Sequence, residues 1–230
     1  MAIGLLGRKV GMTQIYIEET GQAVPVTVIQ AGPCHVLQMR SQDKDGYEAV
    51  QLGYLDKPRR LATRSQRGHV AKLDSKRARK RATAGVEAVA KPGCEPKRLV
   101  REFRGSTEGV SVGDEIGVDA FADISAVDVV GTSKGRGFAG VIKRYGFHRG
   151  PMTHGSRNVR RPGSIGCSAW PAKVVKGKKM PGQYGNDRKT IRNLEIVDIR
   201  PDDNVILLKG AVPGAESGLM AVNKPKFKQN

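Results

Sequence analysis

Residues 131–192 read GTSKGRGFAG VIKRYGFHRG PMTHGSRNVR RPGSIGCSAW PAKVVKGKKM PGQYGNDRKT IR. This segment contains fifteen lysines and arginines but a single acid, Asp187. Glycine and proline recur along its length. Such a segment repels itself and has too little apolar surface to fold alone. Because glycine lacks the Cβ that holds another backbone away, the composition indicates a segment that lies against a dense polyanion, for which a phosphate backbone is the leading candidate.

The charge of the rest of the chain also falls into blocks. The net charge of the whole chain is +18, which places nucleic acid first among possible partners. Residues 57–104 carry a net charge of +12, whereas residues 105–130 carry −6. Residues 1–56 carry −2, and the bases and acids of residues 194–230 balance. Two strongly basic blocks therefore alternate with acidic or near-neutral ones.

The acidic and near-neutral blocks also carry strand patterns. Short β-branched runs alternate with polar turns, which predicts an antiparallel β-barrel or sandwich built from both ends of the chain. The expected turns are residues 18–21, 43–46 and 200–204. The expected strands are Met12 to Ile17, Val24 to Gln30, Val36 to Met39, Tyr47 to Tyr54, Ile116 to Val118, Val127 to Val130, Leu194 to Ile199 and Val205 to Leu208.

These patterns predict a mostly β protein with some α-helix and an irregular basic extension. The expected division is a β-barrel core from residues 1–56, 105–130 and 193–223, an inserted basic subdomain from 57–104, an extension from 131–192, and a basic C-terminal tail from 224–230. Within the insert, Ser75 to Ala90 favours a helix because it is rich in Ala, Lys and Arg, although Gly85 weakens it. The dense run from Lys76 to Arg81 indicates phosphate contact rather than only a solvated helix face.

Several other classes of protein are disfavoured. No apolar run approaches the roughly 18 residues that a membrane-spanning helix needs, and Met1 to Val10 lacks the apolar region of a signal peptide, so we expect a cytoplasmic protein. Cys34, Cys94 and Cys167 are too far apart to indicate a disulfide framework or a zinc site. No nucleophile–base arrangement is present. We therefore expect no catalysis, metal, cofactor or small-molecule substrate.

A glycine motif raises one enzymatic alternative. Residues 135–140, GRGFAG, match the GxGxxG pattern of dinucleotide-binding proteins and follow a predicted strand. The acid expected about twenty residues later is missing, because residues 155–161 read GSRNVRR. A nucleotide-binding oxidoreductase is therefore a remote alternative. Phosphate of RNA held by glycine-rich backbone is the simpler interpretation.

The candidate nucleic-acid contacts lie in the extension. Histidines among arginines more often hydrogen-bond phosphate or backbone than ligate a metal. The chain's one tryptophan, Trp170, and Phe138, Tyr145, Phe147 and Tyr184 either anchor the extension or stack on bases, and the two roles are compatible. The predicted contacts are Lys134, Arg136, Lys143, Arg144, His148, Arg149, His154, Arg157, Arg160, Arg161, Lys173, Lys176, Lys178, Lys179 and Arg188.

Several strings resemble those of one family, the bacterial form of large-ribosomal-subunit protein three. They are GTSKGRGF at 131–138, PMTHGS at 151–156, RPGSIG at 161–166 and KGKKMPG at 176–182. The opening GLLGRKVGMT at 4–13 and the closing LKGAVPG at 208–214 are similar to that family as well. The resemblance therefore runs along almost the whole chain.

The resemblance implies a translation-protein-type antiparallel β-barrel on the subunit surface, with an inserted subdomain and a long extension toward the peptidyl-transferase centre. It implies direct binding of large-subunit rRNA near its 3′ end, a role in nucleating subunit assembly, and no enzymatic activity. Large-subunit proteins fourteen and nineteen are the implied neighbours. The implied tip of the extension consists of Gly163, Ser164, Ile165, Gly166, Cys167, Ser168, Ala169 and Trp170.

Two departures from the family pattern matter. Some relatives carry a methylated glutamine after the Gly-Ser-Ile-Gly string, but residues 167–170 here read CSAW, so that modification is not expected. The run from Arg77 to Val89 is longer than the family pattern leads us to expect. A DNA-compacting architectural protein is the competing interpretation of the charge, and it would show no preference for rRNA over duplex DNA.

Overall fold

The computed structural model describes residues 4–17, 21–85, 90–107 and 109–225. The chain forms two compact units, one from residues 1–132 and 189–230 and the other from residues 133–188. The larger unit holds most of the regular structure, and each unit is described here by itself. No helix in the described ranges is long and apolar enough to cross a membrane.

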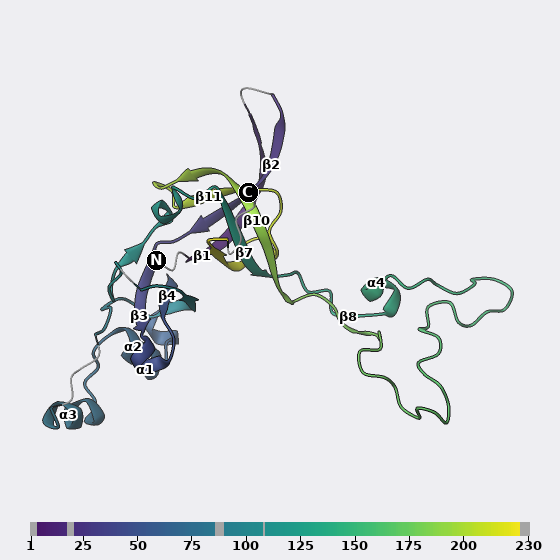
Figure 1. The fold of residues 1–230 in the computed structure, drawn as a ribbon, viewed down its shortest axis with the longest axis horizontal. Helices are drawn as coiled ribbons and strands as arrows, with labels where there is room; N and C mark the ends of the chain where they lie inside the picture. Colours follow the sequence, from purple (N-terminus) through teal and green to yellow (C-terminus); the bar gives the residue numbers. More distant parts are fainter. Residues whose placement is uncertain (1–3, 18–20, 86–89, 108, 226–230) are drawn as a thin grey trace. The chain divides into compact units, whose positions relative to one another are not determined.

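The larger unit contains a closed six-stranded barrel with the strand order β1-β12-β7-β10-β11-β2 (Figure 1). Its strands come from both ends of the chain, so the prediction of a mostly β fold with an antiparallel barrel is confirmed. The hairpin of β10 and β11 forms as expected, with Arg200 opposite Val205. The barrel strands are β1 (Gly4–Tyr16), β2 (Ala23–Ala31), β7 (Ala126–Thr132), β10 (Arg188–Arg200), β11 (Val205–Lys209) and β12 (Leu219–Asn223).

Strand β1 begins eight residues before the predicted Met12, because its first half contains glycines that weaken a strand pattern. A Cβ on Gly4 would lie 2.0 Å from Cδ1 of Phe103, and one on Gly7 would lie 2.6 Å from the Gln30 carbonyl oxygen. Close packing therefore requires glycine where propensity argues against a strand. Strand β12 was not predicted either, although it pairs with β1 from Gly4 to Arg8.

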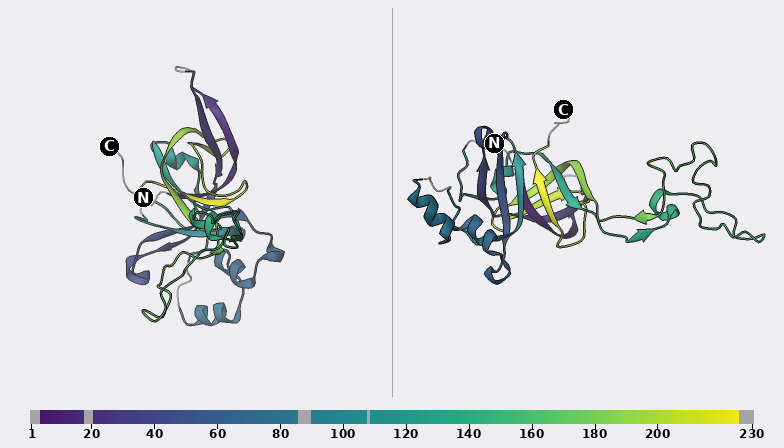
Figure 2. Two further views of the ribbon diagram at one scale, coloured as in Figure 1. Left: turned by 90° about the vertical axis from the view of Figure 1, so that its right-hand side faces the viewer. Right: turned by 90° about the horizontal axis from the view of Figure 1, so that it is seen from below.

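The outer parts of β1 and β2 form a two-stranded ribbon that projects beyond the barrel (Figure 2). Tyr16 pairs with Ala23 at its end, which confirms the predicted hairpin. Of the predicted turn, residues 18–20 lie outside the described residues. The ribbon exposes Met12 and Tyr16, 51% and 62% accessible, because no other strand covers this part of β1.

A second antiparallel sheet has the order β5-β4-β3-β6. The range 1–56, which we assigned as a whole to the barrel, thus supplies strands to both sheets. Strand β5 lies in the range assigned to the basic insert, and its sequence KRLVREFR carries too much charge to give a strand pattern. These strands are β3 (Cys34–Arg40), β4 (Ala49–Asp56), β5 (Lys97–Arg104) and β6 (Glu115–Ile116).

One hydrophobic core joins the barrel to the second sheet. Barrel residues such as Leu6 and Ile29 are fully buried in the same cluster as Val36 of β3 and Leu52 of β4. Phe121, fully buried, belongs to the short 3-10 helix η2 (Val118–Phe121) that packs into this cluster. The larger unit is therefore stabilised by burial of apolar surface from both sheets together.

The basic insert contains the 3-10 helix η1 (Arg59–Leu61) and two short α-helices. Helix α2 (Arg64–Val70) begins with a capping box in which Thr63 and Gln66 satisfy each other's backbone N–H groups. Helix α3 (Lys76–Thr83) is capped by Ser75 and is shorter than predicted. The helix ends before Gly85, which has a φ of 65° and donates its backbone N–H to the Ala82 carbonyl. The rest of the predicted helix includes residues 86–89, which lie outside the described residues.

The predicted turn at residues 43–46 is instead the short helix α1 (Gln42–Asp45), ended by Gly46 with a φ of 76°. The strands that it joins, β3 and β4, pair as expected. The carboxylate of Asp45 accepts a hydrogen bond from the backbone N–H of Ser41 and binds the Arg40 guanidinium at 2.7 Å. These bonds fix the connection between the two strands.

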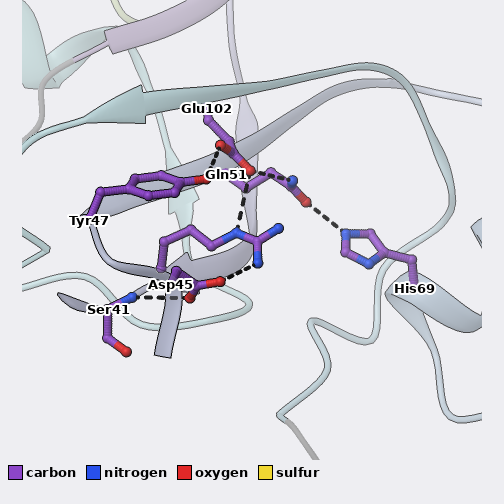
Figure 3. A network of polar contacts seen from close by, with 7 residues as sticks. Ser41, Asp45, Tyr47, Gln51, His69 and Glu102 are labelled. Carbon is purple, nitrogen blue, oxygen red and sulfur yellow. Dashed lines mark hydrogen bonds and ion pairs between the residues drawn. The ribbon is translucent and has the colours of Figure 1, made fainter. Parts of the chain in front are cut away.

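A polar network connects the second sheet to helix α2 (Figure 3). The Glu102 carboxylate accepts hydrogen bonds from Tyr47 and Gln51, at 2.9 and 3.2 Å. Because the Gln51 amide nitrogen is used in this way, its oxygen faces Nε2 of His69, 2.7 Å away. Nε2 therefore donates this bond, and the His69 ring links α2 to strand β4.

The structure predicts an acid-sensitive contribution from His69. Burial, followed by the charges of Lys91 and Arg40, lowers the pKa of this imidazole below its usual 6.5. The unfolded chain therefore binds a proton at higher pH than the folded chain, so stability falls as the pH drops through about 6.5 toward the folded pKa. His69→Gln should reduce this loss, measured by urea unfolding at about pH 7.5 and about pH 5.5. His154→Gln, at an exposed position of the other unit, is the control. An unchanged pH dependence in His69→Gln would contradict the assignment.

Candidate nucleic-acid interface

The smaller unit, residues 133–188, begins with a two-stranded stem. The backbone N–H of Ser133 donates to the carbonyl of Asp187, and the Asp187 N–H donates to the Ser133 hydroxyl. Further along, Arg136 and Gly137 exchange backbone hydrogen bonds with Tyr184 at 2.8 and 2.9 Å. Strands β8 (Phe138–Ala139) and β9 (Gly182–Gln183) continue the pairing.

The glycine string at 135–140 belongs to this stem. We expected its backbone N–H groups to cradle a phosphate, but the Arg136 N–H is already bonded to the Tyr184 carbonyl. The following helix α4 (Val141–Tyr145) has only five residues. The string therefore builds a strand pairing, and its glycines allow the left-handed conformation at Gly137, with a φ of 65°.

Gly185 holds the stem together at its narrowest point. It is buried, has a φ of 71°, and a Cβ there would lie 2.1 Å from the Lys134 carbonyl oxygen. No other residue type fits both constraints, since a side chain would be strained and would also displace the opposite strand.

Arg144 has an internal role that the sequence analysis did not foresee. Its guanidinium donates to the Met180 carbonyl at 2.8 Å and packs over Gly182, where a Cβ would lie 2.6 Å from Nη1. It also lies 5.0 Å from the ring centre of Tyr145. Arg144 thus fastens α4 to the returning chain at Met180 and Gly182.

Residues 148–177 contain no helix or strand. Gly150 donates to the Val159 carbonyl, and a Cβ at Gly150 would lie 2.3 Å from the Asn158 carbonyl oxygen, so two passes of the chain touch here. Gly155, Gly163 and Gly177 adopt positive φ at turns that face open space. Backbone direction in this segment is set by glycine turns rather than by a core.

The structure exposes nearly all of the predicted contact residues. Of that set, only Arg144 is half-buried; the others, from Lys134 to Arg188, are exposed. No ion pair of the described chain involves a residue of 133–188. In the other basic block, by contrast, Arg59 pairs with Glu95 and Arg79 with Asp74. The cations of the extension are therefore uncompensated.

Part of this set surrounds an open groove of about 690 Å³. His148, Arg149 and Arg161 line it, together with Gly150, Asn158, Pro162, Gly163 and Ser164. His154 lies outside this groove, so the two predicted histidines are not brought to one site. No group of histidines, cysteines and acids that could hold a metal occurs among the described residues. The groove offers cations and backbone to an anionic ligand of extended shape.

The aromatic residues of the extension divide into two kinds. Tyr184 lies under Arg136 at 5.1 Å, and Tyr145 packs near Phe147 with ring centres 6.3 Å apart, so these residues anchor the stem. Phe138 and Trp170 are 80% and 87% exposed. Residues 163–170, the implied tip, are all exposed. Trp170 is therefore not a core residue of this unit.

A closed barrel with an irregular loop of exposed, unpaired cations has the charge expected of a structural protein that contacts a polyanion. The family model described as "Ribosomal protein L3" matches residues 60–204. A protein named large ribosomal subunit protein uL3, from Rhodopirellula baltica, is 56% identical over 225 residues, covering 97% of this chain and 98% of the relative.

Two further proteins of that name are each 50% identical over 222 residues. The one from Desulforapulum autotrophicum covers 96% of this chain and 98% of its own length, and the one from Desulfotalea psychrophila covers 96% and 97%. The chain belongs to the ribosomal protein L3 family. It is a structural, non-enzymatic constituent of the large ribosomal subunit in the cytoplasm, with rRNA and other ribosomal proteins as partners.

We predict that Gly185→Ala opens the stem without unfolding the barrel. The new methyl group meets the Lys134 carbonyl oxygen, so the bonds between Arg136 and Tyr184 should lose amide protection in hydrogen exchange. Gly155→Ala is a matched control, because Gly155 has the same φ of 71° but nothing within 4 Å of its Cβ position. The melting temperature of the barrel should change little in either variant. Equal loss of stem protection in both variants would contradict the proposed contact.

Proposed function

We propose that this chain binds large-subunit rRNA directly, near its 3′ end, and helps to nucleate assembly of the subunit. In this proposal the extension, residues 131–192, enters the rRNA and approaches the peptidyl-transferase centre. The dense basic run of the insert, Lys76 to Arg81, adds further phosphate contacts. The observation that carries the proposal is the extension's uncompensated charge: apart from the half-buried Arg144, its cations are exposed, and none has an acid partner among the described residues.

The energetic argument follows from counterion release. A cation that already has a carboxylate partner gains little from a phosphate, because one ion pair replaces another. Arg157, Arg160 and Arg161 have no such partner among the described residues, so each can neutralise a phosphate and release a bound counterion. Folding of the barrel supplies a stable anchor, and rRNA supplies the charge that the extension lacks.

The form of recognition follows from the backbone. The distal segment has neither helix nor strand to place in a groove, and its glycines leave room for close approach. Arginine forks and backbone N–H groups suit phosphates and the shape of folded RNA rather than a base sequence. A segment of this kind gains its order from the RNA that surrounds it.

The neighbours in this proposal are large-subunit proteins fourteen and nineteen, as the family resemblance implies. Crosslinking of assembled subunits followed by mass spectrometry tests it. Crosslinks from the barrel unit to either protein support the assignment, and crosslinks only to other proteins refute it.

We predict steeply salt-dependent binding to a large-subunit rRNA fragment. About a dozen phosphate contacts on loops and single strands give a log–log slope on the order of −8. Replacing Arg157, Arg160, Arg161 and Lys173 by Gln should make the slope shallower by about 3, since each contact on single-stranded RNA contributes about 0.7. Filter binding between about 50 and 200 mM salt measures it.

The control replaces Arg200 and Lys209 by Gln. Both are barrel cations paired with acids, Arg200 with Asp198 at 3.0 Å and Lys209 with Glu195 at 2.7 Å. Their loss should barely change the slope. A wild-type slope near about −2 would show that the basic blocks are mostly solvated. Equal competition by duplex DNA would favour the DNA-compacting alternative.

We predict that Trp170→Ala leaves folding and subunit assembly intact but alters function at the peptidyl-transferase centre. Trp170 is 87% exposed, so its removal opens no cavity, whereas stacking on a base contributes about 1–3 kcal/mol. Aminoacyl-tRNA accommodation, or sensitivity to antibiotics of that centre, is the measurement. Trp170→Phe keeps an aromatic face, so its aminoacyl-tRNA accommodation and antibiotic sensitivity should stay close to those of the wild type. Unchanged accommodation and sensitivity in the alanine variant would refute the contact.

A further inference from the structure

The larger unit has an open cleft of about 500 Å³ that lies away from the extension in sequence. Its lining comes from both sheets. Arg8 of β1 and Leu219 of β12 belong to the barrel, and Leu55 of β4 and Arg98 of β5 belong to the second sheet. Lys57 and Ser217 complete it. The cleft therefore forms only when the two sheets are packed together.

The barrel wall is held in place by strand pairing. Arg8 lies directly opposite Leu219 in the register of β1 and β12. The Arg8 guanidinium donates to the side-chain oxygen of Gln30 at 2.8 Å, which is a neutral partner. Ser217 donates its N–H to the Lys9 carbonyl at 2.7 Å. Position and direction of the Arg8 side chain are thus fixed while its charge stays free.

The opposite wall presents two further cations. The Lys57 N–H donates to the Pro96 carbonyl, and its ammonium donates to Gln66 at 3.0 Å, again a neutral acceptor. Along β5, Lys97 is paired with Asp56 at 2.6 Å, but Arg98 points to the other face and has no ion-pair partner among the described residues. Asp56, the acid next to Lys57 in sequence, is therefore already paired with Lys97.

Two residues of the cleft adopt left-handed backbone without being glycine. Leu55 has a φ of 58° and Ser217 a φ of 61°. This region is unfavourable for a residue such as leucine and persists only where the surrounding structure imposes it. Both residues line the same cleft, so the strain lies at the place where the two walls present their cations. Such strain is typical of ligand-binding positions.

We propose that this cleft is a second RNA-binding site that holds a backbone phosphate between Arg8, Lys57 and Arg98. Leu55 and Leu219 then lie against the attached ribose or base. The site stands on residues separate from those of the extension, and it shares with the function proposed above only the premise that the ligand is rRNA. It would orient the folded unit on the RNA surface, because Arg8 of the barrel and Arg98 of the second sheet line the same cleft.

The test follows amide resonances of Leu55, Lys57 and Ser217 in the full-length protein. One titration uses a large-subunit rRNA fragment and the other uses inorganic phosphate. Shifts of these amides with RNA at stoichiometric concentration support the proposal. Shifts with inorganic phosphate but none with RNA would identify a small-anion site and overturn it, as would the absence of shifts with both.

A charge-matched pair of variants tests specificity. Arg98→Gln removes a cation from the cleft, whereas Arg101→Gln removes one from the opposite face of the same strand. Arg98→Gln should make the salt slope of RNA binding shallower by about 1, and Lys57→Gln with Arg98→Gln by about 2, while Arg101→Gln should leave it unchanged. Equal effects of Arg98→Gln and Arg101→Gln would overturn the proposal.

Two further measurements separate the possible causes of failure. Melting temperatures show that the variants fold, and Arg98→Lys, which keeps the charge, should retain most of the wild-type slope. The four-residue extension variant is measured beside them. If that variant binds RNA normally while the cleft variants do not, the extension's proposed function fails and the cleft stands. If the cleft variants bind RNA normally while the extension variant does not, the cleft proposal is refuted and the function proposed for the extension stands.

Discussion

The pairing of β7 with β10 inside the closed barrel is the constraint on which the rest of the structure depends. These neighbouring strands are separated in sequence by residues 133–187, so their pairing fixes the two ends of this segment side by side. The Ser133 and Asp187 hydrogen bonds then continue the pairing, and Gly185 keeps the two strands close. Because the stem is held in this way, the two ends of the distal segment are kept together without a hydrophobic core in that segment.

The larger unit and residues 133–188 also differ in how their charges are paired. In the larger unit, some exposed cations, such as Arg59 and Lys209, are paired with acids at hydrogen-bonding distance. Each such pair attracts other anions less than a free cation does. In residues 133–188 the one acid, Asp187, contributes its backbone to the stem, and the cations stay unpaired. Exposed surface ion pairs contribute little to stability. Their importance here is that none of them involves a residue of the extension, nor Arg8, Lys57 or Arg98 of the cleft, so these cations keep their charge uncompensated among the described residues.

The sequence predicted those parts of the fold that depend on local pattern. Alternating residues in β2, β4 and β11 gave strands near the right positions. Strand β5 and the first half of β1 were missed, because charged residues and glycines there serve long-range contacts such as the one between Gly4 and Phe103. The internal role of Arg144 and the left-handed Leu55 were unpredictable for the same reason. Each depends on a residue far away in the chain, and no local rule carries that information.

The topology also has a consequence for the time order of synthesis. Strands β10, β11 and β12 follow the extension in the chain, so the barrel lacks half of its six strands when residues 133–188 leave the ribosome. At roughly 5–20 residues per second, the residues from 189 to 230 take several seconds to add, and the strand edges of the barrel stay open until then. The segment suited to a polyanion is thus available before the scaffold that holds it is complete. Open strand edges are the positions at which chains associate edge to edge, so the incomplete barrel is most exposed to such association in this interval.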